Sequence, residues 1–150
     1  MWDKIYKSGK HFSVWPWTDL ITLVQKFAKL KKNSKVLELG CGVGANIPFF
    51  LSKKCDYHGI EQSSFACKYI NKKFKNLGKK IIKGDAAHNI PFEFKFDLIV
   101  DRGCSAHLEQ SKFVKLLDCT YNSLKKRGIF ILTDLYSKKT TLYKDYKKKK

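Results

Sequence analysis

Three glycines at alternate positions, Gly40, Gly42 and Gly44, lie in the segment V-L-E-L-G-C-G-V-G-A-N of residues 36–46. The segment follows a short apolar run and precedes a second one, which is the context of a turn between a strand and a helix. A residue without a Cβ allows a tight turn and a close approach of the backbone to a ligand. Gly40, Gly42 and Ala45 also satisfy the spacing of a dinucleotide-binding loop. The glycines therefore predict a nucleotide-like ligand without deciding which one.

Acidic residues near the ends of four apolar runs favour a cationic ligand over a pyrophosphate. Glu38 precedes the glycine turn by two residues, and Glu61, Asp85 and Asp101 end the next three predicted strands, in a chain with only 13 acidic residues. Carboxylates at this edge would repel a pyrophosphate and attract a cation. S-adenosylmethionine combines a sulfonium cation with a nucleoside, so we expect this cofactor, with S-adenosylhomocysteine as the product. Asp85 is then placed to accept a hydrogen bond from the adenine amino group.

The elements that must position these residues alternate along the chain. Short apolar runs predict five strands, at residues 35–39, 57–61, 80–84, 96–101 and 128–135. Apolar residues at helical spacing predict helices at residues 18–27, 47–51, 63–78 and 113–124. Strands that alternate with helices form a parallel sheet with right-handed crossovers. We therefore predict an α/β fold, a doubly wound and mainly parallel Rossmann-like sheet, whose ligand lies beyond the carboxyl ends of the strands.

Five motifs follow one another along the chain: E-L-G-C-G-V-G, G-I-E-Q-S, G-D-A, F-D-L-I-V-D-R-G and L-K-K-R-G-I-F-I-L-T-D. In this order and at this spacing they resemble the successive motifs of class I S-adenosylmethionine-dependent methyltransferases, over about residues 1–137. The resemblance implies that the methionine part of the cofactor is held by the loop residues Glu38, Gly40, Cys41, Gly42 and Gly44. It also implies that the adenosine part is held by Glu61 at the ribose hydroxyls, by Gln62, and by Asp85 and Ala86 at the adenine.

The N-terminal stretch W-D-K-I-Y-K-S-G-K-H-F-S-V-W-P-W resembles the lead-in of bacterial methyltransferases of this kind, including some found with genes for cell-surface polysaccharides. The resemblance implies a segment that folds over the cofactor. The alternative is that Trp2, Tyr6, Trp15 and Trp17 are simply packing aromatics. The sequence leaves both interpretations open.

Residues 101–108, D-R-G-C-S-A-H-L, follow the fourth predicted strand, where a methyl acceptor would bind. His107 could deprotonate a hydroxyl or amine acceptor, or it could be an ordinary histidine at a helix start. Asp101 could act toward the cofactor's amino group or toward the acceptor. The segment lacks D-P-P-Y or N-P-P-Y, by which methyltransferases of exocyclic amino groups of DNA bases resemble one another, so methylation of such groups is disfavoured.

These residues predict methyl transfer to a small-molecule or sugar-like acceptor. The alternatives are a non-catalytic cofactor- or partner-binding remnant, an RNA or protein methyltransferase and, more distantly, a nicotinamide oxidoreductase. The formal net charge of +18 is the reason to consider RNA, but 29 of the 31 basic residues are lysines spread along the whole chain. Proteins that read phosphates or bases usually rely on arginine. A nucleic-acid partner is therefore less favoured than a lysine-rich composition without function.

The cysteines, histidines and apolar stretches of the chain bear on metal binding and on location. The five cysteines form no C-x-x-C pair and the four histidines show no ligand spacing with them, so no metal site is predicted. Residues 1–10 do not resemble a signal peptide, and no apolar stretch approaches roughly 20 residues. We therefore expect a cytoplasmic protein without a membrane partner.

The chain shows no repeat and no linker, so we expect a single cofactor-binding domain over residues 1–150. It divides into a lead-in and helix at 1–34, a Rossmann-like core at 35–136 and a basic tail at 137–150. The resemblance implies two further strands, but the 15 residues that follow Leu135 are too polar to supply both. We therefore expect a C-terminally shortened sheet of about five strands, whose last strand is an open edge that could pair in a homodimer.

Overall fold

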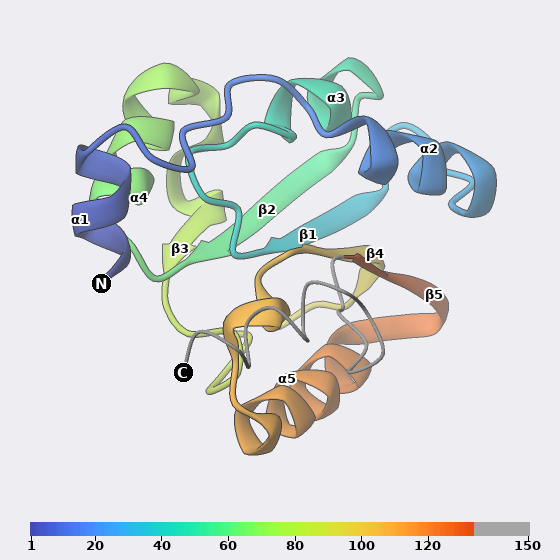
Figure 1. The fold of residues 1–150 in the computed structure, drawn as a ribbon. Coiled ribbons are helices and arrows are strands. Elements are labelled where there is room, and N and C mark those ends of the chain that lie inside the picture. Colours follow the sequence, from blue (N-terminus) through green and yellow to red (C-terminus); the bar gives the residue numbers. More distant parts are fainter. Residues whose placement is uncertain (134–150) are drawn as a thin grey trace.

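The computed structural model describes residues 1–133, which form a five-stranded, all-parallel sheet in the order β3-β2-β1-β4-β5 (Figure 1). The strands are β1 (Lys35–Leu39), β2 (Asp56–Glu61), β3 (Ile81–Lys83), β4 (Phe96–Arg102) and β5 (Leu124–Thr133). The α-helices are α1 (Trp2–Lys7), α2 (Thr18–Phe27), α3 (Ile47–Ser52), α4 (Ser64–Lys73) and α5 (Gln110–Ser123), and two 3₁₀ helices are η1 (Lys75–Lys80) and η2 (Ser105–His107). The predicted α/β class and parallel sheet are confirmed.

Helices cover both faces of the sheet, with α5 on one side and α2, α3 and α4 on the other (Figure 1). The alternation of side chains along a strand explains this arrangement. In β1, Val36 packs with the core beneath α2, α3 and α4, whereas Leu37 and Leu39 pack with Leu116 of α5. Both layers bury continuous apolar surface, which is why the strands have few polar positions.

The strand order reverses beside β1, because β2 lies on one side of this strand and β4 on the other. In doubly wound sheets the crevice at such a switch point, beyond the carboxyl ends of the strands, is where ligands bind. The glycine loop follows β1 and therefore lies at that point. In the described part of the chain, no helix is long and apolar enough to cross a membrane.

Two predicted helix ends are wrong. The helix expected to reach Gly78 ends as an α-helix at Lys73, and the tighter η1 continues from Lys75. Gly78 has a φ of +46°, which lets the chain turn back toward β3, and Leu77 is buried although it is not in an α-helix. The helix expected to reach Leu124 ends at Ser123, because Leu124 already pairs with Phe96 of β4.

The fifth strand begins four residues earlier than predicted and contains an irregularity. Leu124 pairs with Phe96, but the next paired residue, Ile129, lies opposite Leu98. The intervening residues include Arg127, which has a φ of +67°. Regular pairing therefore resumes at Ile129, one residue after Gly128, where the strand was expected to begin. The predicted strand end at Leu135 and the tail at 137–150 lie outside the described residues.

Candidate functional site

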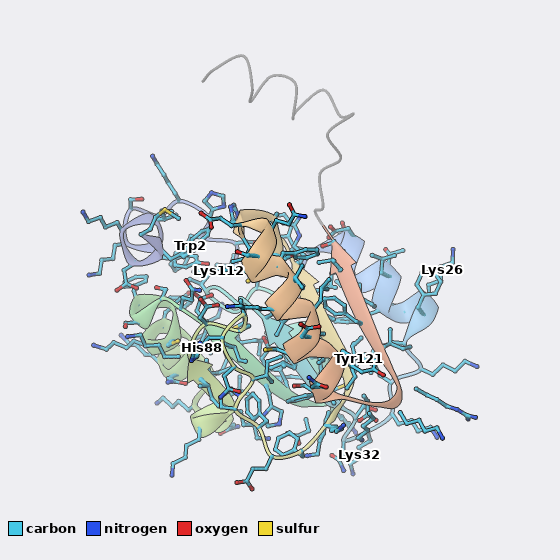
Figure 2. All side chains as sticks on the ribbon, turned by 90° about the horizontal axis from the view of Figure 1, so that it is seen from below. Trp2, Lys26, Lys32, His88, Lys112 and Tyr121 are labelled. Carbon is cyan, nitrogen blue, oxygen red and sulfur yellow. The ribbon has the colours of Figure 1, made fainter. Side chains whose placement is uncertain are left out.

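A cavity of about 1000 Å³ opens at the carboxyl ends of the strands. Its wall combines the glycine loop, the ends of β2 and β3, the segment after β4 and the N-terminal helix α1. Figure 2 shows Trp2 and Lys112, which both line the cavity, at one end of the molecule and Lys32, which precedes β1, at the other. Of the residues predicted to contact a cofactor, all except Gly44 and Asp101 belong to the described lining: Glu38, Gly40, Cys41, Gly42, Glu61, Gln62, Asp85 and Ala86.

The glycine loop requires glycine for a reason beyond contact with a ligand. Gly40 and Gly42 have φ values of +63° and +55°, in the left-handed region that favours glycine. A Cβ on Gly42 would also lie 2.9 Å from the hydroxyl oxygen of Tyr6, and one on Gly40 would lie 2.7 Å from the Cys104 side chain. The loop is therefore a place where α1 and the segment after β4 both approach the backbone closely.

Glu61 fixes the loop to the end of β2. Its carboxylate accepts hydrogen bonds from the backbone N–H groups of Gly42, at 2.8 Å, and Ser63, at 2.7 Å. Burial raises the pKa of Glu61, while the backbone hydrogen bonds oppose that shift. A buried carboxylate that lines the cavity can accept further hydrogen bonds from a ligand's hydroxyl groups. The ribose contact expected of Glu61 stays a prediction.

Glu38 is held in a buried network that the sequence did not predict. The Tyr57 hydroxyl donates to one carboxylate oxygen at 2.6 Å, and the Asn46 amide donates to the other at 2.7 Å. The Asn46 carbonyl oxygen in turn accepts from the Trp17 N–H at 2.9 Å. Burial raises the pKa of Glu38 to about 7, although both side-chain hydrogen bonds act to lower it. The carboxyl is therefore poised to respond to a nearby cation.

Asp85 lines the cavity after β3, where the adenine is expected. Its carboxylate accepts from the Ala87 N–H at 3.0 Å, and the Lys112 ammonium lies 4.0 Å away. Ala86 is buried beside it, and Gln62 is exposed after β2. These positions form a continuous wall with Glu61, and their contacts to the cofactor stay predictions.

Asp101 and His107 are close in sequence but differ in their surroundings. Asp101 is fully buried, and its carboxylate accepts from the N–H groups of Cys104, at 2.8 Å, and Ser105, at 3.2 Å. These bonds brace the segment that carries His107, which lines the cavity and is exposed. The geometry therefore favours a positioning role for Asp101 over direct contact with an acceptor.

Residues of the helix α1 line the cavity, and the expectation that this segment folds over the cofactor stays a prediction. The Asp3 carboxylate accepts from the Ser63 hydroxyl at 2.5 Å and from the Phe65 N–H at 3.2 Å, at the start of α4. The hydrogen bond from Ser63 is the main cause of the lowered pKa of Asp3. Trp2 makes an edge contact with His107, with ring centroids 5.0 Å apart. The sequence did not single out Asp3, whose partners lie about 60 residues away along the chain.

Comparison with known proteins shows which family the chain resembles. Residues 36–128 match the methyltransferase domain family. Phosphoethanolamine N-methyltransferase of Plasmodium falciparum (isolate 3D7) is 32% identical over 108 residues, which are 71% of this chain and 41% of the relative. The chain therefore spans less than half the length of this curated relative.

Two solved structures illustrate the similarity of fold. The glycopeptide N-methyltransferase MtfA complexed with sinefungin has a TM-score of 0.66 at 18% identity, covering 77% of this chain and 48% of its own. A TehB-like SAM-dependent methyltransferase from Corynebacterium glutamicum has a TM-score of 0.65 at 20% identity, covering 87% of this chain and 67% of its own. Because the family match covers more than half of the sequence and includes the glycine loop, the chain belongs to the methyltransferase domain family.

Proposed function

We propose that the chain binds S-adenosylmethionine in this cavity and transfers its methyl group to a small-molecule or sugar-like acceptor. The observation that carries the proposal is the charge of the cavity wall. The lining contains five carboxyl side chains, Asp3, Glu38, Glu61, Asp85 and Glu109, against three basic ones, Lys83, Arg102 and Lys112, although the chain as a whole has a formal net charge of +18. Carboxylates gathered at the glycine loop suit a ligand that is cationic at one end and a nucleoside at the other.

The proposed placement of the cofactor follows the wall from β1 to β3. Glu61 holds the ribose hydroxyls, and Asp85, Ala86 and Gln62 surround the adenine. Glu38 acts at the methionine end, where its charge attracts the cation and its hydrogen bond to Asn46 fixes the loop. Tyr6 packs against Gly42 and closes this end of the cavity.

The proposed reaction is an in-line displacement: bound S-adenosylmethionine would supply the electrophilic methyl carbon, a lone pair of the acceptor would form the new bond to it, and the carbon–sulfur bond would break with its electrons on sulfur to leave S-adenosylhomocysteine. This chain's residues align the acceptor, exclude water and remove its proton. His107 is the proposed base, and Trp2 and α1 shield the site from solvent.

A non-catalytic binding chain, an RNA substrate and a homodimer would each give a distinct experimental result. Binding of S-adenosylhomocysteine without any turnover would identify a non-catalytic binding chain, and RNA retention that weakens steeply with salt would favour an RNA substrate. A homodimer through β5 would join two chains at the strand that ends the described sheet order. Sedimentation at several concentrations tests that pairing.

Calorimetric titration with S-adenosylhomocysteine tests the binding half of the proposal. We expect affinity in the micromolar range for the wild type and a loss of about 1–3 kcal/mol for Glu61→Ala, the scale for removing a buried charged hydrogen-bond acceptor. Glu93→Ala is the matched control, because Glu93 is exposed and precedes β4 at the opposite end of the sheet. Equal affinity of the wild type and Glu61→Ala would contradict the proposal.

Transfer of a labelled methyl group tests the catalytic half. The wild type, loaded with labelled S-adenosylmethionine and mixed with small-molecule cell extract, is expected to label a small product. His107→Ala should lower the rate and leave the affinity for S-adenosylhomocysteine unchanged. Label found only in RNA or protein would overturn the acceptor class.

A further inference from the structure

A second cavity, of about 470 Å³, lies at the amino end of β2. It opens between the end of α3 and η1, which follows α4 on the same face of the sheet (Figure 1). Its lining comprises Leu51, Cys55, Tyr57, Lys73, Phe74, Lys75, Asn76, Leu77 and Lys80. The described linings of the two cavities share no residue, and a volume of several hundred Å³ is typical of small-molecule sites. The second cavity is therefore a candidate for a separate ligand.

The inner wall of the second cavity is apolar. Tyr57, Leu77 and Cys55 are buried, and Leu51 is 40% exposed at the entrance. The Tyr57 hydroxyl donates to Glu38 at 2.6 Å, so the polar end of this side chain already has a partner. Burial raises the pKa of the Cys55 thiol, which therefore adds no negative charge at neutral pH. Walls of this kind suit the hydrocarbon part of a ligand.

The charged residues of this lining are all basic: Lys73, Lys75 and Lys80. The Lys73 ammonium lies 5.3 Å from the centroid of the Phe74 ring, so its charge lies beside the apolar wall. The Lys80 ammonium lies 2.7 Å from a carboxylate oxygen of Asp56, but the same carboxylate also pairs with Lys35, at 2.9 Å. One carboxylate cannot neutralise two ammonium groups, so the potential at the cavity stays positive.

We propose that the second cavity is a binding site for a small amphipathic anion, a compound with a hydrocarbon body and one anionic head group such as a carboxylate. The body packs against Tyr57 and Leu77, and the head group lies among the three lysines. A cation of the same shape is repelled by these lysines, and a small inorganic anion leaves the apolar wall in water. The site lies at the opposite end of β2 from the proposed methyl transfer and does not depend on it.

Titration of the full chain with octanoate tests this site, with calorimetry for the affinity and backbone-amide NMR shifts for the location. We expect binding in the millimolar range or tighter, with the largest shifts in residues 51–57 and 73–80. Acetate has only the head group and 1-octanol only the body, so each should bind at least about fivefold more weakly. Octylamine, the cation, should bind weakest, and added salt should weaken octanoate binding.

Substitutions separate the lining lysines from the general positive charge. Lys73→Gln combined with Lys75→Gln should weaken octanoate binding about fivefold and leave 1-octanol binding unchanged. Lys68→Gln combined with Lys72→Gln is the matched control, because it removes the same charge from exposed positions of α4 that line neither cavity. Leu51→Glu should abolish octanoate binding, whereas Leu51→Lys, at the same partly exposed position, should retain it.

Four results would overturn the inference. They are no octanoate binding, 1-octanol binding as tightly as octanoate, equal weakening by the control pair and the lining pair, and displacement of octanoate by S-adenosylhomocysteine. The last result would place the anion in the cavity at the carboxyl ends of the strands. Failure of S-adenosylhomocysteine to bind, with octanoate behaving as expected, would refute the proposed function and leave this inference standing.

Discussion

The affinity for S-adenosylhomocysteine should increase as the pH rises through neutrality, because Glu38 must be ionised to attract the ligand's ammonium group. Burial raises the pKa of Glu38 to about 7, from an ordinary value of 4.5. At pH 6 such a carboxyl is ionised in about one molecule in ten. An affinity that requires the ionised form is then about tenfold lower at pH 6 than at pH 8, or about 1.4 kcal/mol.

The pH dependence of folding stability has the opposite sign to the pH dependence of ligand affinity. A raised pKa means that the folded protein binds the proton more tightly than the unfolded chain does. The stability that Glu38 contributes is therefore present below pH 4.5 and lost as the pH rises through about 7. The bound cation favours the carboxylate and lowers its pKa, so ligand binding releases a proton near neutrality.

Calorimetry between pH 5.5 and 8.5 measures this effect, and buffers of different ionisation enthalpy count the released protons. Glu38→Gln is the comparison, because it keeps the shape of the side chain and removes the titration. The pKa of Glu61 is also raised by burial, so Glu61 contributes to the change of affinity with pH in both proteins. The difference between wild type and variant in that change is therefore due to Glu38. Identical pH dependence of wild type and variant, or wild-type affinity that falls across this range, would show that ionised Glu38 does not attract the ligand.

Two further substitutions test the loop and the core. Gly42→Ala places a Cβ 2.9 Å from the Tyr6 hydroxyl at a φ of +55° and should lower the affinity for S-adenosylhomocysteine about tenfold or more. Gly9→Ala has a φ of +77° but meets no atom within 4 Å, so it should retain binding in the same calorimetric assay. Leu116→Ala removes a fully buried side chain between α5 and the sheet and should lower the free energy of unfolding by about 2–5 kcal/mol. Leu51→Ala, at a side chain that is 40% exposed, should cost less than about 1 kcal/mol in the same urea titration.

The features that could be predicted from the sequence are those that local patterns determine. The alternation of strands and helices predicted the parallel sheet. The carboxylates at the strand ends predicted the edge of the sheet at which the cavity opens. The exact helix ends were missed, because Leu77 is buried by a 3₁₀ turn as well as an α-helix would bury it.

The contacts that could not be predicted join distant parts of the chain. Asn46 meets the Trp17 backbone 29 residues away, and Asp3 meets Ser63 60 residues away. Nothing in the residues around Asn46 or Asp3 indicates these partners. The hydrogen bonds that the Asp101 carboxylate accepts from the N–H groups of its own loop were likewise not predicted, and its expected contact with a ligand stays a prediction.

The most direct test of the central claim is a crystal structure of the chain grown with S-adenosylhomocysteine. We expect the adenine beside Asp85, the ribose hydroxyls on the Glu61 carboxylate and the amino-acid end over Gly40 and Gly42. A nucleoside bound elsewhere, or a cavity that stays empty at saturating ligand, would contradict it.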